Sequence, residues 1–348
     1  MKRFLKDVAL FLCPIALLVL FYAVLIEPEY QKGRYLYNEI GELGFVFFDE
    51  NYNKSFTSPL EEYKVNRYRP ETLVRKDDIL TIGDSFSQKY NMGNDGYPNF
   101  LAYMSGRNVY NFEKVAYSNP FTHYQSLLSH NASLPGTVIL ECVECKLIER
   151  LQELDFNDTT FVYDRPFEDK EIEANRKSKK TLLENLHTYL DRMSDFYRKQ
   201  FNSPVKHLHL DREVFTCKGK ESDLYVDDET LPRSYSDADI KLVASKINEL
   251  VQRTNEMGIR LIIVVPSDRY DFYYDYIVDT RYGKNNLLDD LSPLVDKMSF
   301  VNGKELLLPY RDAGIKDIYW ANDTHWSPFA SEMMARKLIE MLCSDSGN

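Results

Sequence analysis

Apolar and polar positions alternate in a regular way from residue 78 onward. Short apolar runs at 78–83, 108–112 and 137–142 predict strands, and the run at 137–142 is continuous enough to be buried on both faces. Between these runs, segments 99–105 and 120–128 predict helices. The first part of the chain after residue 77 therefore follows a strand, helix, strand order.

The same alternation resumes near residue 236. Ser236 is a predicted N-cap for a helix that runs to Met257, with apolar residues every three or four positions. Strands are predicted at Ile259–Val265 and Ser299–Val301, and a last helix from Ser327 to Leu342. Strands that alternate with helices predict an α/β fold: a three-layer sandwich with a mostly parallel sheet and an active site at the carboxyl ends of the strands.

Residues 153–235 interrupt the alternation. They contain a basic patch at 176–180, an amphipathic helical segment at 183–197 and an alternating strand pattern at 207–211. We interpret this stretch as an insertion of helix and strand over the sheet. The predicted organisation is a membrane anchor at 1–30, a juxtamembrane segment at 31–76 and a catalytic domain at 77–348 that carries the insertion.

An uncharged apolar run extends from Val8 to Ile26, close to the length of about 20 residues that spans a bilayer. Lys2, Arg3 and Lys6 precede it, so the positive-inside rule predicts a cytoplasmic N-terminus and an extracytoplasmic, periplasmic catalytic domain held by a single transmembrane helix. A cleaved signal peptide is the alternative, although no small-x-small cleavage site follows the run.

The net charge of −11 argues against a nucleic-acid partner, because neutralising phosphates needs a basic face. No glycine-rich nucleotide loop is present, and no cofactor is expected.

Cys142 and Cys145 form a C-x-x-C without a second ligand pair, which favours buried thiols or a disulfide over a metal site. His207 and His209 share a strand face near Asp211, but an amphipathic strand is the preferred interpretation. His123 and His130 have no partner that the sequence reveals.

Gly83-Asp84-Ser85 comes directly after the first predicted strand. Glycine permits a tight turn there, and the turn lifts Ser85 to the edge of the sheet with its backbone N–H pointing outward. Such a tripeptide is a weak signal by itself, because an ordinary strand-to-helix turn has the same composition.

Asp323-Thr324-His325-Trp326 precedes the final predicted helix. In an extended segment, residues two apart project to the same side, so Asp323 can orient one ring nitrogen of His325 and leave the other for a nucleophile. A serine hydroxyl needs such a base before it attacks a carbonyl group. Ser85, Asp323 and His325 are therefore a predicted catalytic triad.

These two motifs resemble those of the SGNH (GDSL-like) hydrolase superfamily, and specifically its branch of bacterial alginate O-acetyltransferase-like proteins. Segments 138–150 and 265–274 are similar to segments of that branch. The resemblance implies a membrane-anchored extracytoplasmic enzyme that moves acetyl groups onto an exported polysaccharide, with Ser85 as the acetyl-carrying nucleophile. A membrane-bound partner is expected to supply the acetyl group, since acetyl-coenzyme A is not expected outside the cytoplasm.

The oxyanion hole is less clear from the sequence. The resemblance implies a Gly and an Asn in the second and third motif blocks, and no G-x-N-D follows the third strand. The candidate amide donors are Asn111 and Asn119, besides the backbone N–H of Ser85. Arg269 and Tyr270 follow the strand at Ile259–Val265, where a substrate contact or a structural role is equally expected.

Two alternatives remain at this stage. A glycan acetyl esterase would use the same triad, with water in place of the sugar hydroxyl. A non-catalytic glycan-binding component of a secretion complex is the other alternative, and the presence of all three triad residues argues against it.

Overall fold

The computed structural model describes residues 11–14, 17, 60–69, 71–88, 92–112, 119–130, 132–158 and 205–344 of the 348-residue chain. The predicted anchor at Val8–Ile26 falls almost entirely outside these residues, as does the amphipathic segment 183–197. No helix within the described residues combines the length and apolar content that a membrane span requires.

The central sheet has six parallel strands in the order β1-β3-β2-β4-β7-β8. Its strands are β1 (Asn66–Arg67), β2 (Ile79–Ile82), β3 (Val109–Phe112), β4 (Thr137–Glu141), β7 (Arg260–Val265) and β8 (Phe300–Asn302). Without β1, this is the flavodoxin-like doubly wound order. In this order the second strand, here β3, is added on one side of the first strand, here β2, and the later strands are added on its other side. Ligands of such folds bind beyond the carboxyl ends of the strands at the point where the strand order changes side, and Ser85 follows β2.

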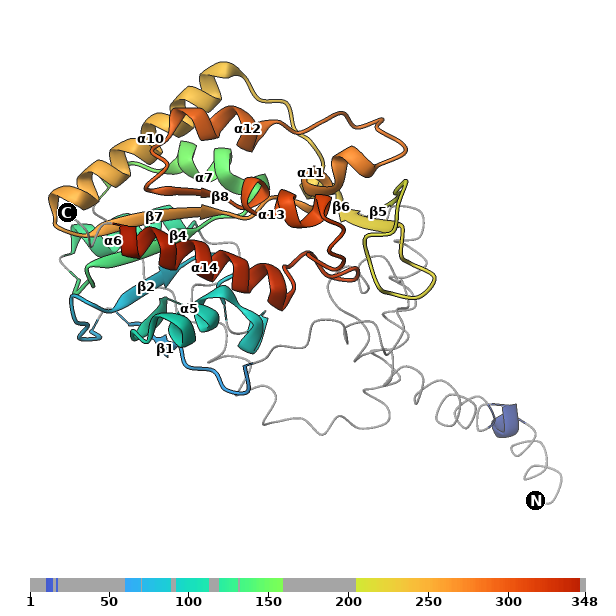
Figure 1. Ribbon diagram of the computed structural model, residues 1–348, viewed down its shortest axis with the longest axis horizontal. Helices are drawn as coiled ribbons and strands as arrows, with labels where there is room; N and C mark the ends of the chain where they lie inside the picture. Colours follow the sequence, from blue (N-terminus) through green and yellow to red (C-terminus); the bar gives the residue numbers. More distant parts are fainter. Residues whose placement is uncertain are drawn as a thin grey trace.

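Helices cover both faces of the sheet and complete three layers. One face carries α5 (Tyr97–Ser105), α13 (Gly303–Asp312) and α14 (Pro328–Ser344), with α14 lying along α5 (Figure 1). The other face carries α6 (Pro120–Ser129), α7 (Leu147–Glu153), α10 (Asp237–Glu256) and α12 (Leu287–Leu291). Strand residues alternate between these layers: Ile79 packs with the first group and Leu80 with the second.

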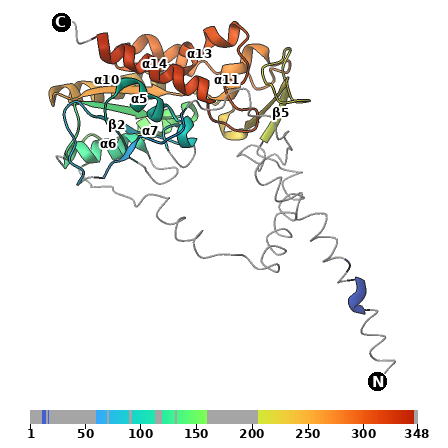
Figure 2. The same ribbon diagram turned by 60° about the horizontal axis from the view of Figure 1, so that its bottom comes forward.

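A two-stranded antiparallel sheet, β5 (Val205–His209) with β6 (Asp223–Asp227), forms a separate small unit. It lies at one end of the molecule beside α11 (Arg269–Tyr273), as both ribbon views show (Figures 1 and 2). The remaining short helices are η3 (Gly93–Asp95), η4 (Glu144–Lys146), η5 (Asp228–Thr230), η6 (Tyr274–Tyr276) and η7 (Ser292–Leu294).

The predicted α/β class and parallel sheet are confirmed, and the predicted strands and helices between residues 78 and 142 appear within one or two residues of their expected ends. Helix α10 begins as expected after Ser236, whose side chain accepts from the Asp239 backbone N–H while the Asp239 carboxylate accepts in return. The strand pattern at 207–211 corresponds to β5.

The start of the catalytic domain needs a correction. Strand β1 pairs with β3, Asn66 opposite Tyr110 and Arg67 opposite Asn111, so the sheet includes residues before position 77. Part of the segment interpreted as juxtamembrane therefore belongs to the fold. A two-residue edge strand has too little apolar pattern to be recognised from sequence.

Candidate active site

The turn after β2 holds Ser85 at the edge of the sheet. A Cβ atom at Gly83 would lie 2.5 Å from Glu141 Oε2 and 2.6 Å from Ser87 Oγ, so only glycine fits this close approach. The Asp84 carbonyl accepts from the Ser87 backbone N–H at 3.1 Å and from its hydroxyl at 3.0 Å. These contacts fix the turn, and Ser85 lies on it partly exposed.

Asp323 and His325 lie together just before α14. One oxygen of the Asp323 carboxylate, Oδ1, accepts from the His325 backbone N–H at 3.0 Å and also contacts the ring nitrogen Nδ1. Burial by itself raises the pKa of Asp323, but the charge of His325 and its hydrogen bonds outweigh that effect and lower the pKa below its ordinary value. The opposite ring nitrogen, Nε2, is buried. This is an ionised carboxylate that orients an imidazole.

Phe86 joins the two motifs. Its ring lies 4.9 Å from the His325 ring and 4.9 Å from the Trp326 ring, measured between centroids. Because Phe86 directly follows Ser85, the fold places the Gly83-Asp84-Ser85 turn beside the Asp323–Trp326 segment, although more than 200 residues separate them in the chain.

Arg269 lies within the protein beside this site and is 2% exposed. Its guanidinium donates to the Tyr225 carbonyl at 2.9 Å and to the Ala321 carbonyl at 3.3 Å, and its charge helps to lower the pKa of Asp323. Tyr270 is fully buried, and its hydroxyl donates to the Gly283 carbonyl at 2.7 Å. A substrate contact and a structural role were the two alternatives for Arg269 and Tyr270. The burial and hydrogen bonds of both residues fit the structural role.

The asparagine candidates for the oxyanion hole need a correction. Asn111 is 1% exposed, and its amide donates to Thr81 Oγ1 and to the Ser87 carbonyl, both at 2.8 Å, which occupies both amide hydrogens. Asn119 caps α6 by accepting from the Phe121 N–H, and its amide donates to the Arg150 carbonyl at 2.7 Å. Neither amide has a donor directed at Ser85.

Sequence reasoning missed a buried ion pair under the turn. The Asp84 carboxylate contacts the Arg150 guanidinium and accepts from the Val143 backbone N–H at 3.1 Å. Asp84 stands in the motif and Arg150 closes the similar segment 138–150, but nothing in the sequence connects two residues 66 positions apart.

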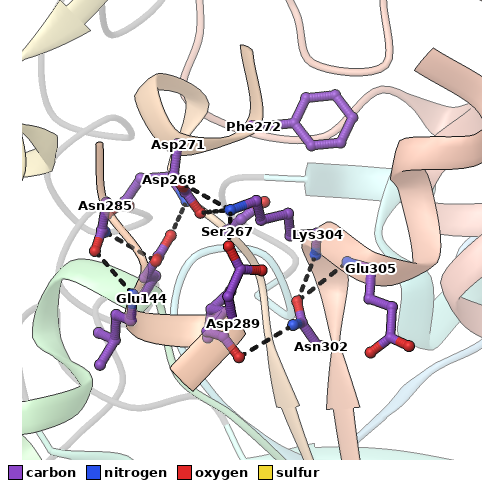
Figure 3. A network of polar contacts seen from close by, with 12 residues as sticks. Glu144, Ser267, Asp268, Asp271, Phe272, Asn285, Asp289, Asn302, Lys304 and Glu305 are labelled. Carbon is purple, nitrogen blue, oxygen red and sulfur yellow. Dashed lines mark hydrogen bonds and ion pairs between the residues drawn. The ribbon is translucent and has the colours of Figure 1, made fainter. Parts of the chain in front are cut away.

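A second group of charges, buried except for Asp289, lies at the carboxyl ends of β4 and β7 (Figure 3). The Glu144 carboxylate accepts from the Asp268 backbone N–H at 2.8 Å and from the Asn285 amide at 2.9 Å. The Lys304 ammonium lies 2.9 Å from the Asp271 carboxylate and 3.0 Å from that of Asp289.

Burial raises the pKa of Glu144 and Asp268 well above the ordinary range of carboxylates, and it raises the pKa of Asp271 to about 6. Glu144 and Asp268 border a hollow of about 160 Å³.

Among the described residues, four further histidines and five cysteines lie outside the Asp323–Trp326 segment. His207 lies 3.0 Å from the Asp223 carboxylate and stacks on Tyr225, whereas Asp211 pairs with Arg212. The described residues contain no group of three His, Cys, Asp or Glu side chains arranged to hold a metal ion. His123 packs on Phe112, and His130 contacts the Ser126 carbonyl. None of the five cysteines, all of which are described, forms a disulfide.

Comparison with known families gives one match. Residues 217–347 match the family described as SGNH hydrolase-like domain, acetyltransferase AlgX. The matched range includes Asp323 and His325 and starts inside the stretch interpreted as an insertion, whereas Ser85 lies upstream of it. No curated protein matches the chain. Residues 217–347 are therefore similar to the SGNH hydrolase-like domain of that acetyltransferase family, and this similarity supports an enzyme of the acyltransferase or esterase type.

Proposed function

We propose that this protein is a serine O-acetyltransferase that acts on an exported or cell-surface polysaccharide through Ser85, His325 and Asp323. The observation that carries the proposal is the packing of Phe86 on His325, since it puts the serine turn next to an imidazole already oriented by a carboxylate. The family match supports acetyl transfer as the chemistry.

In the proposed first step, Ser85 Oγ attacks the acetyl carbonyl carbon of the donor, and His325 Nε2 takes the hydroxyl proton. Asp323 stabilises the imidazolium that forms. The tetrahedral intermediate collapses to an acetyl ester on Ser85, and the donor's leaving group departs with the proton from His325. The Ser85 backbone N–H is the first candidate donor to the oxyanion.

In the second step, a sugar hydroxyl gives its proton to His325 and attacks the acetyl-Ser85 carbonyl. The new ester forms on the sugar, and Ser85 recovers its proton from His325 as it leaves. An esterase would differ only in the acceptor, which would be water. Exclusion of water from the acetyl-enzyme therefore decides between the two activities.

We further propose that the apolar run Val8–Ile26 anchors the protein with its catalytic domain outside the cytoplasm, and that a membrane-bound partner supplies the acetyl group. Protease treatment of intact spheroplasts tests the orientation: degradation of the catalytic domain supports it, and protection contradicts it.

The function is tested by comparing cells that carry the wild-type protein with cells that carry Ser85→Ala. The acetate content of the surface polysaccharide and acetate release from a chromogenic acetyl ester are measured in parallel. Loss of polysaccharide acetate in the variant supports transfer, whereas a gain would indicate an esterase. Equal values in both assays would contradict a role for Ser85.

A further inference from the structure

We propose that Asp84 and Arg150 are a positioning pair that fixes Ser85 and keeps a neutral electrostatic environment beside it. This inference rests on the proposed function of Ser85. Asp84 is 7% exposed and Arg150 is 6% exposed, so the two charges face each other inside the protein, one residue from the nucleophile.

The contacts of this pair connect three elements that meet behind the turn. The Asp84 carboxylate contacts Arg150 of α7 and accepts from the Val143 backbone N–H just beyond β4. The Arg150 guanidinium also lies 3.4 Å from Cys142 Sγ. The Arg150 backbone carbonyl accepts from the side-chain amide of Asn119, at the start of α6. The Asp84 side chain therefore connects the turn after β2 to the end of β4 and to α7, and the Arg150 backbone carbonyl connects α7 to α6.

Stability alone is a poor explanation for this arrangement. A buried ion pair gains little over apolar side chains of similar volume, because both charges lose their hydration. Its specific effect is geometric, since Arg150 Nη1 contacts both Asp84 Oδ2 and Cys142 Sγ and so holds the carboxylate beside the end of β4. The Asp84 carbonyl is also held by Ser87, so both the backbone and the side chain next to Ser85 are fixed.

The charge of Arg150 has a second consequence for the reaction. Attack by Ser85 creates a negative oxygen close to the turn, and an unpaired Asp84 carboxylate would repel it in a site with little water. Arg150 cancels that charge. Cys142 adds no negative charge beside Arg150, because burial raises the pKa of its thiol to about 12 and keeps it protonated.

The test measures kcat and KM for a chromogenic acetyl ester with the full chain. Arg150→Met leaves Asp84 unpaired, and a misplaced nucleophile is expected to lower kcat by about 10- to 100-fold with KM little changed. In the double variant Asp84→Asn/Arg150→Gln both charges are gone and a side-chain hydrogen bond is still possible, so most of the lost kcat is expected to return. Arg336→Gln removes an arginine from the exposed Glu332 pair on α14 and serves as the matched control.

Unchanged kcat in Arg150→Met, or a double variant no better than Arg150→Met at equal folded fraction by circular dichroism, would overturn the inference. If Arg150→Met does not fold, Arg150→Lys replaces it: the charge is kept but the planar guanidinium that contacts both Asp84 and Cys142 is lost, and a smaller fall in kcat is expected. Activity that survives in Ser85→Ala would contradict the proposed function itself, which separates the two failures.

Discussion

Phe86 and His325 lie with their ring centroids 4.9 Å apart, and this contact joins the two halves of the proposed site. Phe86 is 5% exposed. Truncation to Ala removes a buried ring and is expected to cost about 3–5 kcal/mol in the free energy of unfolding. Because the ring also holds His325 in place, kcat for acetyl-ester cleavage should fall further than the loss of folded protein explains.

The control for this prediction is Phe86→Leu, which keeps most of the buried volume and should retain more of both properties. Denaturant titration gives the unfolding free energy, and kinetics below the unfolding transition give kcat. Full kcat per folded molecule in Phe86→Ala would show that the contact serves stability only.

Asp323→Asn tests the orientation of His325. The amide keeps the shape of the side chain but loses the charge that stabilises the imidazolium and selects its tautomer. A fall in kcat of up to about 10⁴-fold is expected, by analogy with other serine triads. The comparison variant is Asp317→Asn. Asp317 is a buried aspartate that accepts from the Thr216 backbone N–H and is not a member of the proposed triad, so kcat should stay near the wild-type value. A loss below tenfold in Asp323→Asn would argue against a triad.

Arg269→Met is expected to change the pH profile of kcat. Arg269 helps to hold the pKa of Asp323 down, because its positive charge favours the ionised carboxylate. Without Arg269, Asp323 binds a proton at a higher pH, and a protonated Asp323 no longer stabilises the imidazolium. The acidic limb of the profile should therefore move upward, and an unmoved limb in a folded variant would contradict the assigned position of Arg269.

Three buried carboxylates of Figure 3, those of Glu144, Asp268 and Asp271, should make the protein less stable as pH rises. Glu144, Asp268 and Asp271 have folded-state pKa values above their unfolded ones because burial disfavours their charged forms. Their contribution is complete below the unfolded pKa of about 4 and is lost as pH rises through the folded values, which for Asp271 is about 6.

Glu144→Gln keeps the side-chain shape without the titration. It should flatten the fall in unfolding free energy as pH rises above the unfolded pKa of about 4, measured by urea titration at each pH. Glu332→Gln, on the surface of α14, should leave the slope unchanged. An equal slope in wild type and Glu144→Gln would show that Glu144 does not titrate as described.

Local patterns explain why so much of the fold could be predicted. Continuous apolar runs identify β4 and β7, and the capping box at Ser236 and Asp239 marks the start of α10. Helix α13 was not predicted, since it carries Pro309 in its interior and follows β8 without an intervening loop. Propensity rules read such a proline as a helix break, and tertiary packing overrides them here.

The residues of the candidate site also differ in how far the sequence predicts their contacts. Asp323 and His325 are close in sequence, so their spacing alone predicts their contact. Asn111 and Arg150 have partners 24 to 66 residues away in the chain. No local pattern predicts that the Asn111 amide donates to Thr81 and Ser87, or that Arg150 pairs with Asp84. Long-range hydrogen bonds decide which polar residues remain available for chemistry.

The central claim is that Ser85 carries the acetyl group. The most direct measurement is peptide mass spectrometry of the full chain quenched by acid during turnover of a chromogenic acetyl ester. One added acetyl group is expected on the peptide that contains Ser85, and no added acetyl group is expected in Ser85→Ala. An acetyl group found on another residue of an active enzyme, or turnover that continues in Ser85→Ala, would contradict it.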